Sequence, residues 1–186
     1  MKIILGSNSP RRVSLLAQMG YTFEQRIAEI EEQINPTLPY HKIPESIAIQ
    51  KFQNLSPGLS DNELLICADT LVFLNDQILS KPRDTEEAQH MLKELSGQEH
   101  IVITGVCLGN LDTKTTFSEQ TKIFFGTLSD YQIQYYVNEY SVLDKAGAYG
   151  IQDWIGLIAI HRIDGSYTNV MGLPTQKLYQ HINNYQ

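Results

Sequence analysis

The sequence predicts an α/β fold built on a mixed β-sheet. Short apolar runs typical of strands alternate loosely along the chain with amphipathic patterns typical of helices. Two of these runs, 100–108 and 115–125, flank a polar turn, so we expect an antiparallel hairpin that a purely parallel sheet would lack. With 186 residues, of which 42% are hydrophobic and 19% charged, the chain can bury a substantial core. We therefore predict a single domain over residues 1–186, whole or in two lobes.

The first 20 residues predict a strand, a polar turn and a helix. Residues 2–5 suit a short buried strand, and the small polar residues 6–8 follow at once. Ser9 with Pro10 is typical of a helix start, because a capping hydroxyl precedes a proline in the first turn. Gly20 is typical of the end of such a helix.

A second helix is expected after a long irregular stretch. Residues 21–34 look partly extended, and residues 35–44 hold three prolines, which favours a loop. Apolar residues then recur at helical spacing in a helix that would carry Lys51.

The central strand is predicted to be interrupted by polar residues. Residues 64–67 are apolar, Asp69 and Thr70 break the run, and residues 71–74 resume it before a turn into a short strand. A carboxylate among apolar residues is costly unless it is hydrogen-bonded, paired or bound to a cation. Asp69 is therefore either a cap for a neighbouring loop or a general base or metal ligand held on a rigid strand.

Helix signals and apolar runs predict the remaining elements. Asp84 with Glu87 resembles a capping box, and Gly97 would end that helix. Ser129 is expected to cap another amphipathic helix. The last expected elements are a strand at 157–163, a turn and short strand within 165–173, and a terminal helix from Pro174 to about residue 185.

Charge and motif content exclude several classes of protein. A net charge of −7 and a pI near 5.2 argue against a basic surface for nucleic acid. The sequence contains no dinucleotide fingerprint, no phosphate loop, no nucleophile elbow and no histidine pair at metal-ligand spacing.

The sequence also predicts a cytoplasmic protein without a membrane span. No apolar run approaches about 18 residues, the length of a membrane span. The N-terminus is too short and strand-like for a signal peptide. Cys67 and Cys107 lie in apolar stretches and are expected as buried free thiols.

The turn and helix near the N-terminus indicate an anion site. Arg11 and Arg12 would lie in the first helical turn, where a positive charge opposes the helix dipole. A bound anion would reverse that effect, because backbone N–H groups, the Ser7 and Ser9 hydroxyls and two guanidinium groups would converge on it. The alternative is a pair of solvated surface arginines. The strand–turn–helix junction favours phosphate binding, since such junctions are common ligand sites.

Two lysines and two late motifs complete the candidate set. Lys51 and Lys81 are further candidates for a functional site, although lone lysines are usually solvated. The motif at residues 144–152 contains small residues and two glycines, and its sequence is Asp-Lys-Ala-Gly-Ala-Tyr-Gly-Ile-Gln. It indicates either a backbone that lies close to a ligand or a tight turn. Residues 165–174, Gly-Ser-Tyr-Thr-Asn-Val-Met-Gly-Leu-Pro, are best explained by local structure.

Taken in order, these motifs resemble the Maf family of nucleotide pyrophosphatases. The resemblance spans residues 3–178. It rests on the motifs Ser-Asn-Ser-Pro-Arg-Arg, Ala-Asp-Thr and Lys-Pro and on the two late motifs. It implies a fold similar to that of inosine-triphosphate pyrophosphatase, with an elongated mixed sheet, flanking helices and two lobes around a cleft. It implies a hydrolase that cuts a nucleoside triphosphate into monophosphate and pyrophosphate. A divalent cation (Mg, Mn or Co) and a homodimer are also implied.

The resemblance further implies a role for each matching residue. Asp69 corresponds to the proton acceptor for the attacking water, and Asp69 with Glu32 would hold the cation, although Glu31 is adjacent to Glu32. The residues that would bind the triphosphate are Ser7, Ser9, Arg11, Lys51 and Lys81. The residues linked to the choice of base are Arg12, Thr70 and Gln152.

The sequence of residues 145–152 resembles that of the branch of the family that acts on dTTP and UTP. Modified pyrimidine nucleotides are further expected substrates. Asp153 departs from the pattern, because glycine is common there. Two alternatives stay open: the branch that acts on 7-methyl-GTP, and a nucleotide-binding regulator of cell division and septum formation. Retention of Asp69 favours catalysis, since a pure binder would not need a buried base.

Overall fold

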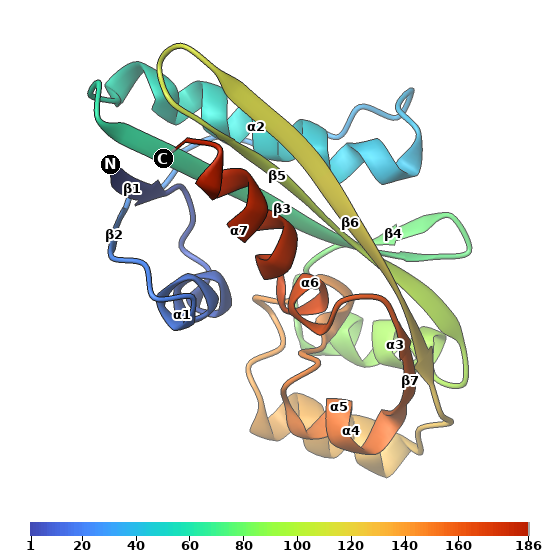
Figure 1. Ribbon diagram of the computed structural model, residues 1–186. Coiled ribbons are helices and arrows are strands. Elements are labelled where there is room, and N and C mark those ends of the chain that lie inside the picture. Colours follow the sequence, from blue (N-terminus) through green and yellow to red (C-terminus); the bar gives the residue numbers. More distant parts are fainter. Residues whose placement is uncertain (186) are drawn as a thin grey trace. The chain divides into compact units, whose positions relative to one another are not determined.

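The predicted α/β fold with a mixed sheet and flanking helices is confirmed. The structure is a computed structural model that describes residues 1–185. Within those residues the strands form one seven-stranded sheet in the order β2-β1-β3-β5-β6-β7, with β4 paired to β3 (Figure 1). β1 pairs in parallel with β2 and β3, whereas β4 is antiparallel to β3 and β7 is antiparallel to β6.

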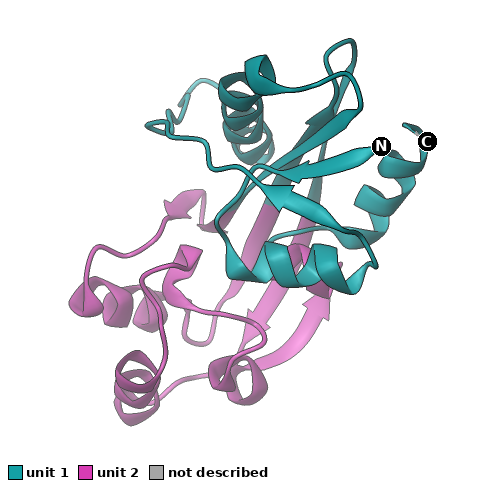
Figure 2. Cartoon of the chain, turned by 90° about the vertical axis from the view of Figure 1, so that its left-hand side faces the viewer, with its two compact units in different colours: residues 1–70, 104–119, 172–186 teal, residues 71–103, 120–171 magenta. Residues whose placement is uncertain are grey.

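The chain divides into two compact units, each assembled from separate segments (Figure 2). Unit 1 comprises residues 1–70, 104–119 and 172–186, and unit 2 comprises residues 71–103 and 120–171. The expectation of two lobes around a cleft stays a prediction, as does the single domain.

Three long strands contribute residues to both units: β3 (Glu63–Leu74), β5 (Glu99–Gly109) and β6 (Lys114–Phe125). The other elements of unit 1 are β1 (Lys2–Leu5), α1 (Pro10–Gln18), β2 (Phe23–Gln25), η1 (Tyr40–Lys42), α2 (Ile43–Leu55), η2 (Ser56–Gly58) and α7 (Thr175–Asn183). Those of unit 2 are β4 (Gln77–Leu79), α3 (Thr85–Leu95), α4 (Asp130–Glu139), η3 (Ala146–Ala148), α5 (Trp154–Ala159), β7 (Ile160–Asp164) and α6 (Tyr167–Met171).

Helix α2 covers one face of the sheet in unit 1. Its Ala48 and Phe52 pack with Ile4 of β1 and with Leu65 and Cys67 of β3 in one apolar cluster. Alternate residues of a strand point to the same face, so Leu65, Cys67 and the next residue in that alternation, Asp69, share the α2 face. The apolar part of β3 therefore directs a carboxylate toward α2. Both cysteines are free and buried, as predicted.

Unit 2 has its own core, formed by helices α3, α4 and α5 and the adjoining strand segments. Leu92, Ile123, Tyr136 and Ile155 are completely buried in it. The predicted caps of α3 and α4 are confirmed, because Asp84 accepts the Glu87 N–H and Ser129 forms a full capping box with Gln132. No helix within residues 1–185 has the length and apolar character that a membrane crossing requires.

The predicted interruption of the central strand is wrong. β3 runs without a break from Glu63 to Leu74, and both Asp69 and Thr70 lie within it. The ladder can continue because their side chains find polar partners, Lys51 for Asp69 and Arg12 for Thr70. The polar pair therefore does not mark the end of a strand.

Two short segments near the C-terminus are helical where strands were expected. Residues 154–159 form α5 because Ile155 and Ala159, four positions apart, are both buried, whereas Leu157 is 80% exposed. The strand β7 begins only at Ile160. Residues 167–171 form α6, whose buried Asn169 donates to the carbonyl oxygen of Val102 and to Thr121. The loop expected at 35–44 ends earlier than predicted, since α2 begins at Ile43.

The N-terminal helix begins and ends as predicted, but Ser9 does not cap it. Ser9 occupies the N-cap position, and its side chain forms no capping bond within the described residues. Its backbone N–H instead donates to Ser7 Oγ at 3.2 Å. The first turn of α1 therefore lacks a Ser9 side-chain cap, and it holds no acidic residue.

A buried carboxylate stabilises the edge of unit 1 at the start of β3. Glu63 accepts from Arg26 at 2.6 Å and from the Ser60 N–H at 3.0 Å, and Lys2 lies 3.4 Å away. The Arg26 hydrogen bond, helped by Ser60, lowers the pKa of Glu63 from 4.5 to about 2.

We expect Glu63→Gln to lower the Tm at neutral pH. A depressed folded-state pKa adds stability above the unfolded value near 4.5, and this stability is lost as pH falls through the folded value of about 2. The Tm difference between wild type and variant should therefore shrink as pH falls between these two values. Thermal unfolding across that range, with the exposed Glu139→Gln as control, measures it. A Tm difference independent of pH would contradict this assignment.

Candidate functional site

The candidate site in unit 1 centres on Asp69. Its side chain is 11% exposed, and its Oδ1 accepts a 2.6 Å hydrogen bond from Lys51 Nζ of α2. Within the described residues its other oxygen, Oδ2, is buried without a hydrogen-bond partner. Buried carboxylate oxygens are normally satisfied, so Oδ2 has capacity for a water, a ligand or a cation.

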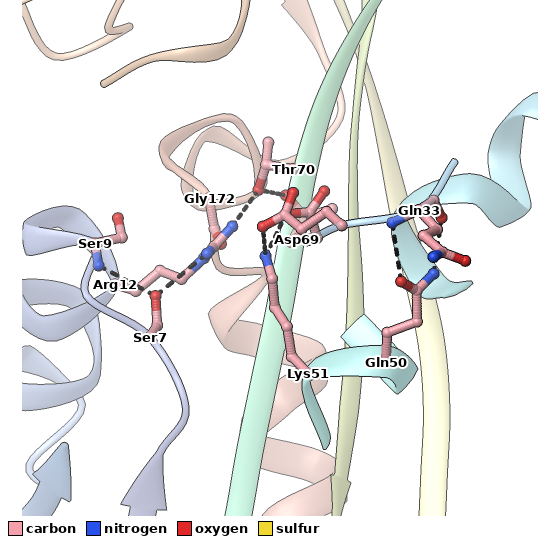
Figure 3. Close-up of polar contacts among 11 residues, drawn as sticks. Ser7, Ser9, Arg12, Gln33, Gln50, Lys51, Asp69, Thr70 and Gly172 are labelled. Carbon is pink, nitrogen blue, oxygen red and sulfur yellow. Dashed lines mark hydrogen bonds and ion pairs between the residues drawn. The ribbon is translucent and has the colours of Figure 1, made fainter. Parts of the chain in front are cut away.

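Lys51 joins two carboxylates. Its ammonium group lies 2.6 Å from Asp69 Oδ1 and 2.8 Å from Glu32 Oε1, and its side chain is only 12% exposed. Figure 3 shows Lys51 pointing toward Asp69 from α2. The structure therefore brings together three residues that lie far apart in the sequence, and it selects Glu32 rather than Glu31 as the Lys51 partner.

The environment of Asp69 changes its acidity in opposing directions. Burial raises the pKa of Asp69 above its ordinary value, while the positive charges of Lys51 and Arg12 lower it and the nearby Glu32 raises it further. The burial effect dominates. A carboxylate with a raised pKa is a better proton acceptor than an exposed one, because its conjugate acid is weaker.

Arg12 forms a second set of contacts beside Asp69. It is buried, and its three nitrogens donate to the Gly172 carbonyl oxygen at 2.7 Å, to Thr70 Oγ1 at 2.9 Å and to Ser7 Oγ at 3.3 Å (Figure 3). Thr70 Oγ1 also shares a 2.9 Å hydrogen bond with Thr104 of β5. Burial lowers the pKa of Arg12, whereas Asp69 raises it. A solvated surface position is therefore excluded for Arg12.

The turn between β1 and α1 has the features expected of an anion site. Ser7 is buried, and its backbone carbonyl accepts from Gln25 Nε2 at 3.1 Å, which ties the turn to β2. Ser9 and Arg11 are half-buried at the start of α1. The anion site at this helix end stays a prediction, for which the missing Ser9 side-chain cap leaves room.

The two remaining candidates, Lys81 and Gln152, belong to unit 2. Lys81 is exposed between β4 and α3. Gln152 is exposed at the end of the glycine-containing motif, and its Nε2 donates to Asp153 Oδ1 at 3.1 Å. Asp69 belongs to unit 1, and a role for these two residues in its site stays a prediction.

Asp153, where the sequence departs from the family pattern, is a structural carboxylate. Its Oδ2 accepts from the buried Tyr136 hydroxyl at 2.7 Å and lies 3.6 Å from the buried ammonium of Lys145. A side chain at Gly150 would collide with Asp153 and Gln152. The small residues of this motif thus permit a tight turn that packs against its own side chains, and the charge of Asp153 is balanced within unit 2.

Several contact residues gave no signal in the sequence. Gly172 looked like part of a structural turn, yet its carbonyl orients Arg12, and its φ of 112° favours glycine. Thr104 is one polar residue in an apolar strand, and Gln50, whose amide hydrogen-bonds to the Gln33 backbone, is an ordinary helix residue before Lys51. Only a three-dimensional arrangement can reveal such partners.

Comparison with known proteins identifies the family. The profile of the family described as Maf-like protein matches residues 2–185, nearly the whole chain. The chain belongs to the Maf-like family. The motifs that carried the resemblance therefore reflect true membership of the family.

Similar Maf-like relatives carry a consistent name. The chain is 46% identical over 185 residues to a protein of Parabacteroides distasonis named "dTTP/UTP pyrophosphatase". The aligned region covers 99% of this chain and 96% of that protein. The chain is 47% identical over 179 residues to a protein of the same name from Phocaeicola vulgatus, covering 96% and 93%. Among solved structures, a nucleoside-triphosphatase / dITP/XTP pyrophosphatase from Mycobacterium abscessus is similar with a TM-score of 0.47 at 14% identity, covering 98% of this chain and 94% of that one.

Proposed function

We propose that this chain is a nucleoside triphosphate pyrophosphatase that hydrolyses dTTP and UTP, and modified pyrimidine nucleotides, to the monophosphate and pyrophosphate. The names of its Maf-like relatives support the substrate class. The observation that carries the proposal is Asp69, a buried carboxylate on a strand with one oxygen on Lys51 and the other without a partner in the described residues. Such a group is suited to accept a proton or to position a water.

The proposed reaction is attack of water on the α-phosphorus. A new bond forms between the water oxygen and phosphorus, the bond to the bridging oxygen breaks, and pyrophosphate leaves with the bonding electrons. Asp69 takes the proton from the water or holds the water in position. Arg11, Lys51 and Lys81, with the Ser7 and Ser9 hydroxyls, bind the triphosphate, where fixed positive charges stabilise the charge that develops on the leaving group.

The residues around Asp69 also fit a divalent cation. Asp69 and Glu32 supply hard oxygen donors, and the partnerless buried Oδ2 of Asp69 among the described residues is one available site. Within residues 1–185 no group of three or more His, Cys, Asp or Glu side chains could hold a metal. We therefore propose that the protein contributes Asp69 and Glu32 and that substrate phosphates and water complete the shell, as is usual for Mg²⁺. The bound cation would neutralise charge on the phosphate oxygens.

Product analysis tests the proposed reaction. We expect UTP to yield UMP and pyrophosphate, without UDP or orthophosphate. In ¹⁸O-labelled water the label should enter UMP, because water attacks the α-phosphorus. Chromatography and ³¹P NMR measure both outcomes. Accumulation of UDP would end the proposal, and label in pyrophosphate would place the attack on the β-phosphorus.

A second test concerns the base. The Gln152 amide can accept from the N3–H of uracil through Oε1 and donate through its remaining N–H, since Asp153 fixes the other one. We therefore expect UTP and dTTP to be preferred over CTP and GTP. Gln152→Ala should lower kcat/KM for UTP by about tenfold, the value of one or two net hydrogen bonds, and change kcat/KM for CTP much less.

The control for this comparison is Gln134→Ala, an exposed glutamine of α4 in the same unit. Equal losses on UTP and CTP in Gln152→Ala would remove Gln152 from base selection. A wild-type preference for 7-methyl-GTP would instead assign the chain to that branch of the family. Tight nucleotide binding without turnover would favour the regulatory role.

We also propose a cytoplasmic location and a homodimer, both of which rest on the family resemblance. Light scattering on the purified chain measures the oligomeric state. A monomer at micromolar concentration would reject the dimer.

A further inference from the structure

We propose that Gln50 is a positioning residue that holds Glu32 against the Lys51–Asp69 pair by clamping the backbone of Gln33. The inference rests on the proposed function, because it assigns Gln50 a role in the same site. It concerns residues that lie within unit 1.

The clamp consists of two hydrogen bonds between one side-chain amide and one backbone residue. The Gln33 N–H donates to Gln50 Oε1 at 3.0 Å, and Gln50 Nε2 donates to the Gln33 carbonyl oxygen at 2.8 Å. Figure 3 shows both bonds beside the Lys51–Asp69 contact. The amide satisfies the two backbone groups that a neighbouring β-strand would otherwise satisfy.

Glu32 needs such a clamp because little else fixes its position. Residues 26–35 contain neither helix nor strand, and residues 31–34 are all exposed. The Glu32 side chain is 44% exposed, so its ion pair with Lys51 is screened by water. A screened ion pair alone is too weak to offset the entropy lost when an irregular segment is ordered.

The sequence neighbours of the clamp explain how it acts on the site. Gln50 and Lys51 are consecutive in α2, and Gln33 and Glu32 are consecutive in the irregular segment. The contact of Gln50 with Gln33 therefore brings the next pair, Lys51 and Glu32, within 2.8 Å. Two adjacent contacts fix both the position and the direction of the segment, as a single contact could not.

The test replaces Gln50 by methionine, which has a similar length and a high helix propensity but cannot form either hydrogen bond. Gln50→Met should lower kcat/KM for UTP about tenfold, the scale seen when a residue supporting a functional ligand is lost. The Tm should stay close to that of wild type. Amide exchange at Gln33 should accelerate, which reports the clamp independently of any activity. Gln53→Met, at an exposed glutamine on the same helix, is the control and should change none of these values.

A double-mutant cycle with Glu32→Gln separates positioning from a general structural effect. If Gln50 acts through Glu32, Gln50→Met should cost less than about twofold in the Glu32→Gln background. Equal losses in both backgrounds, or unchanged Gln33 exchange in Gln50→Met, would overturn the proposal. A wild-type chain that hydrolyses no nucleotide would reject the proposed function itself, whereas an active wild type with additive losses would reject only the role of Gln50.

Discussion

Asp69→Asn should lower kcat for UTP by at least about a hundredfold, the usual contribution of a positioned acid–base group. The amide cannot accept a proton at neutral pH, and it removes the negative charge that attracts a cation. The swap is nearly isosteric, and the Oδ1 of asparagine can still accept the Lys51 hydrogen bond. Lys51 also keeps Glu32 as a partner at 2.8 Å. The fold should therefore survive.

Single-turnover kinetics, circular dichroism and thermal unfolding together check this expectation. The control is Asp61→Asn, an exposed aspartate of the same unit that should retain normal turnover. Near-normal turnover in Asp69→Asn, with an unchanged Tm, would remove Asp69 from the mechanism. Loss of activity with loss of the fold would instead assign Asp69 a structural role.

Removal of divalent cations should abolish hydrolysis completely. The substrate carries several negative charges, and it must approach two carboxylates, Asp69 and Glu32. Lys51 already neutralises part of their charge in the absence of a ligand. Because Lys51 is already paired with these carboxylates, we propose that a divalent cation supplies further positive charge for the phosphate oxygens. Excess EDTA should stop the reaction, and Mg²⁺, Mn²⁺ or Co²⁺ should restore it.

Two adjacent glutamates, Glu32 and Glu31, provide a variant and its matched control for the metal prediction. Glu32→Gln should raise the Mn²⁺ concentration needed for half-maximal activity about tenfold or more, because it removes a proposed ligand. Glu31→Gln should leave that concentration unchanged, since Lys51 contacts Glu32. Mn²⁺ binding followed by electron paramagnetic resonance gives the same comparison without turnover. Full activity in excess EDTA would contradict the requirement.

The sequence predicted those parts of the fold where local chemistry and tertiary structure agree. Proline favours the start of α1 through its fixed φ angle, and Asp84 and the capping box at Ser129 begin α3 and α4 through local hydrogen bonds. The strand predicted at 157–163 was wrong in its first half, because a short apolar run suits either a strand or one helical turn. Only the burial of Ile155 and Ala159 decides for a helix.

The candidate site was predictable in its charged residues and not in their supports. Charged and hydroxyl groups in apolar surroundings, such as Asp69, are conspicuous because burial must be compensated. Gln50, Thr104 and the Gly172 carbonyl have no such signal, since an amide on a helix surface or a backbone oxygen is ordinary in any sequence. Their roles depend on contacts between segments that are distant along the chain. Such contacts cannot be obtained from composition or periodicity.

The hydrogen bond from Arg12 to the Gly172 carbonyl joins residues 160 positions apart and constrains how the protein can be made. In a nascent chain the arginine leaves the ribosome 160 residues before the residue that provides its acceptor. Unit 1 also needs residues 104–119 and 172–186 in addition to its N-terminal segment. Contacts between such distant segments form slowly, because the entropy of closing the long intervening loop is lost before the contacts stabilise the fold. A truncated translation product that ends before Gly172 would therefore hold its guanidinium without this acceptor, and synthesis must pass residue 172 before the arginine contacts are complete.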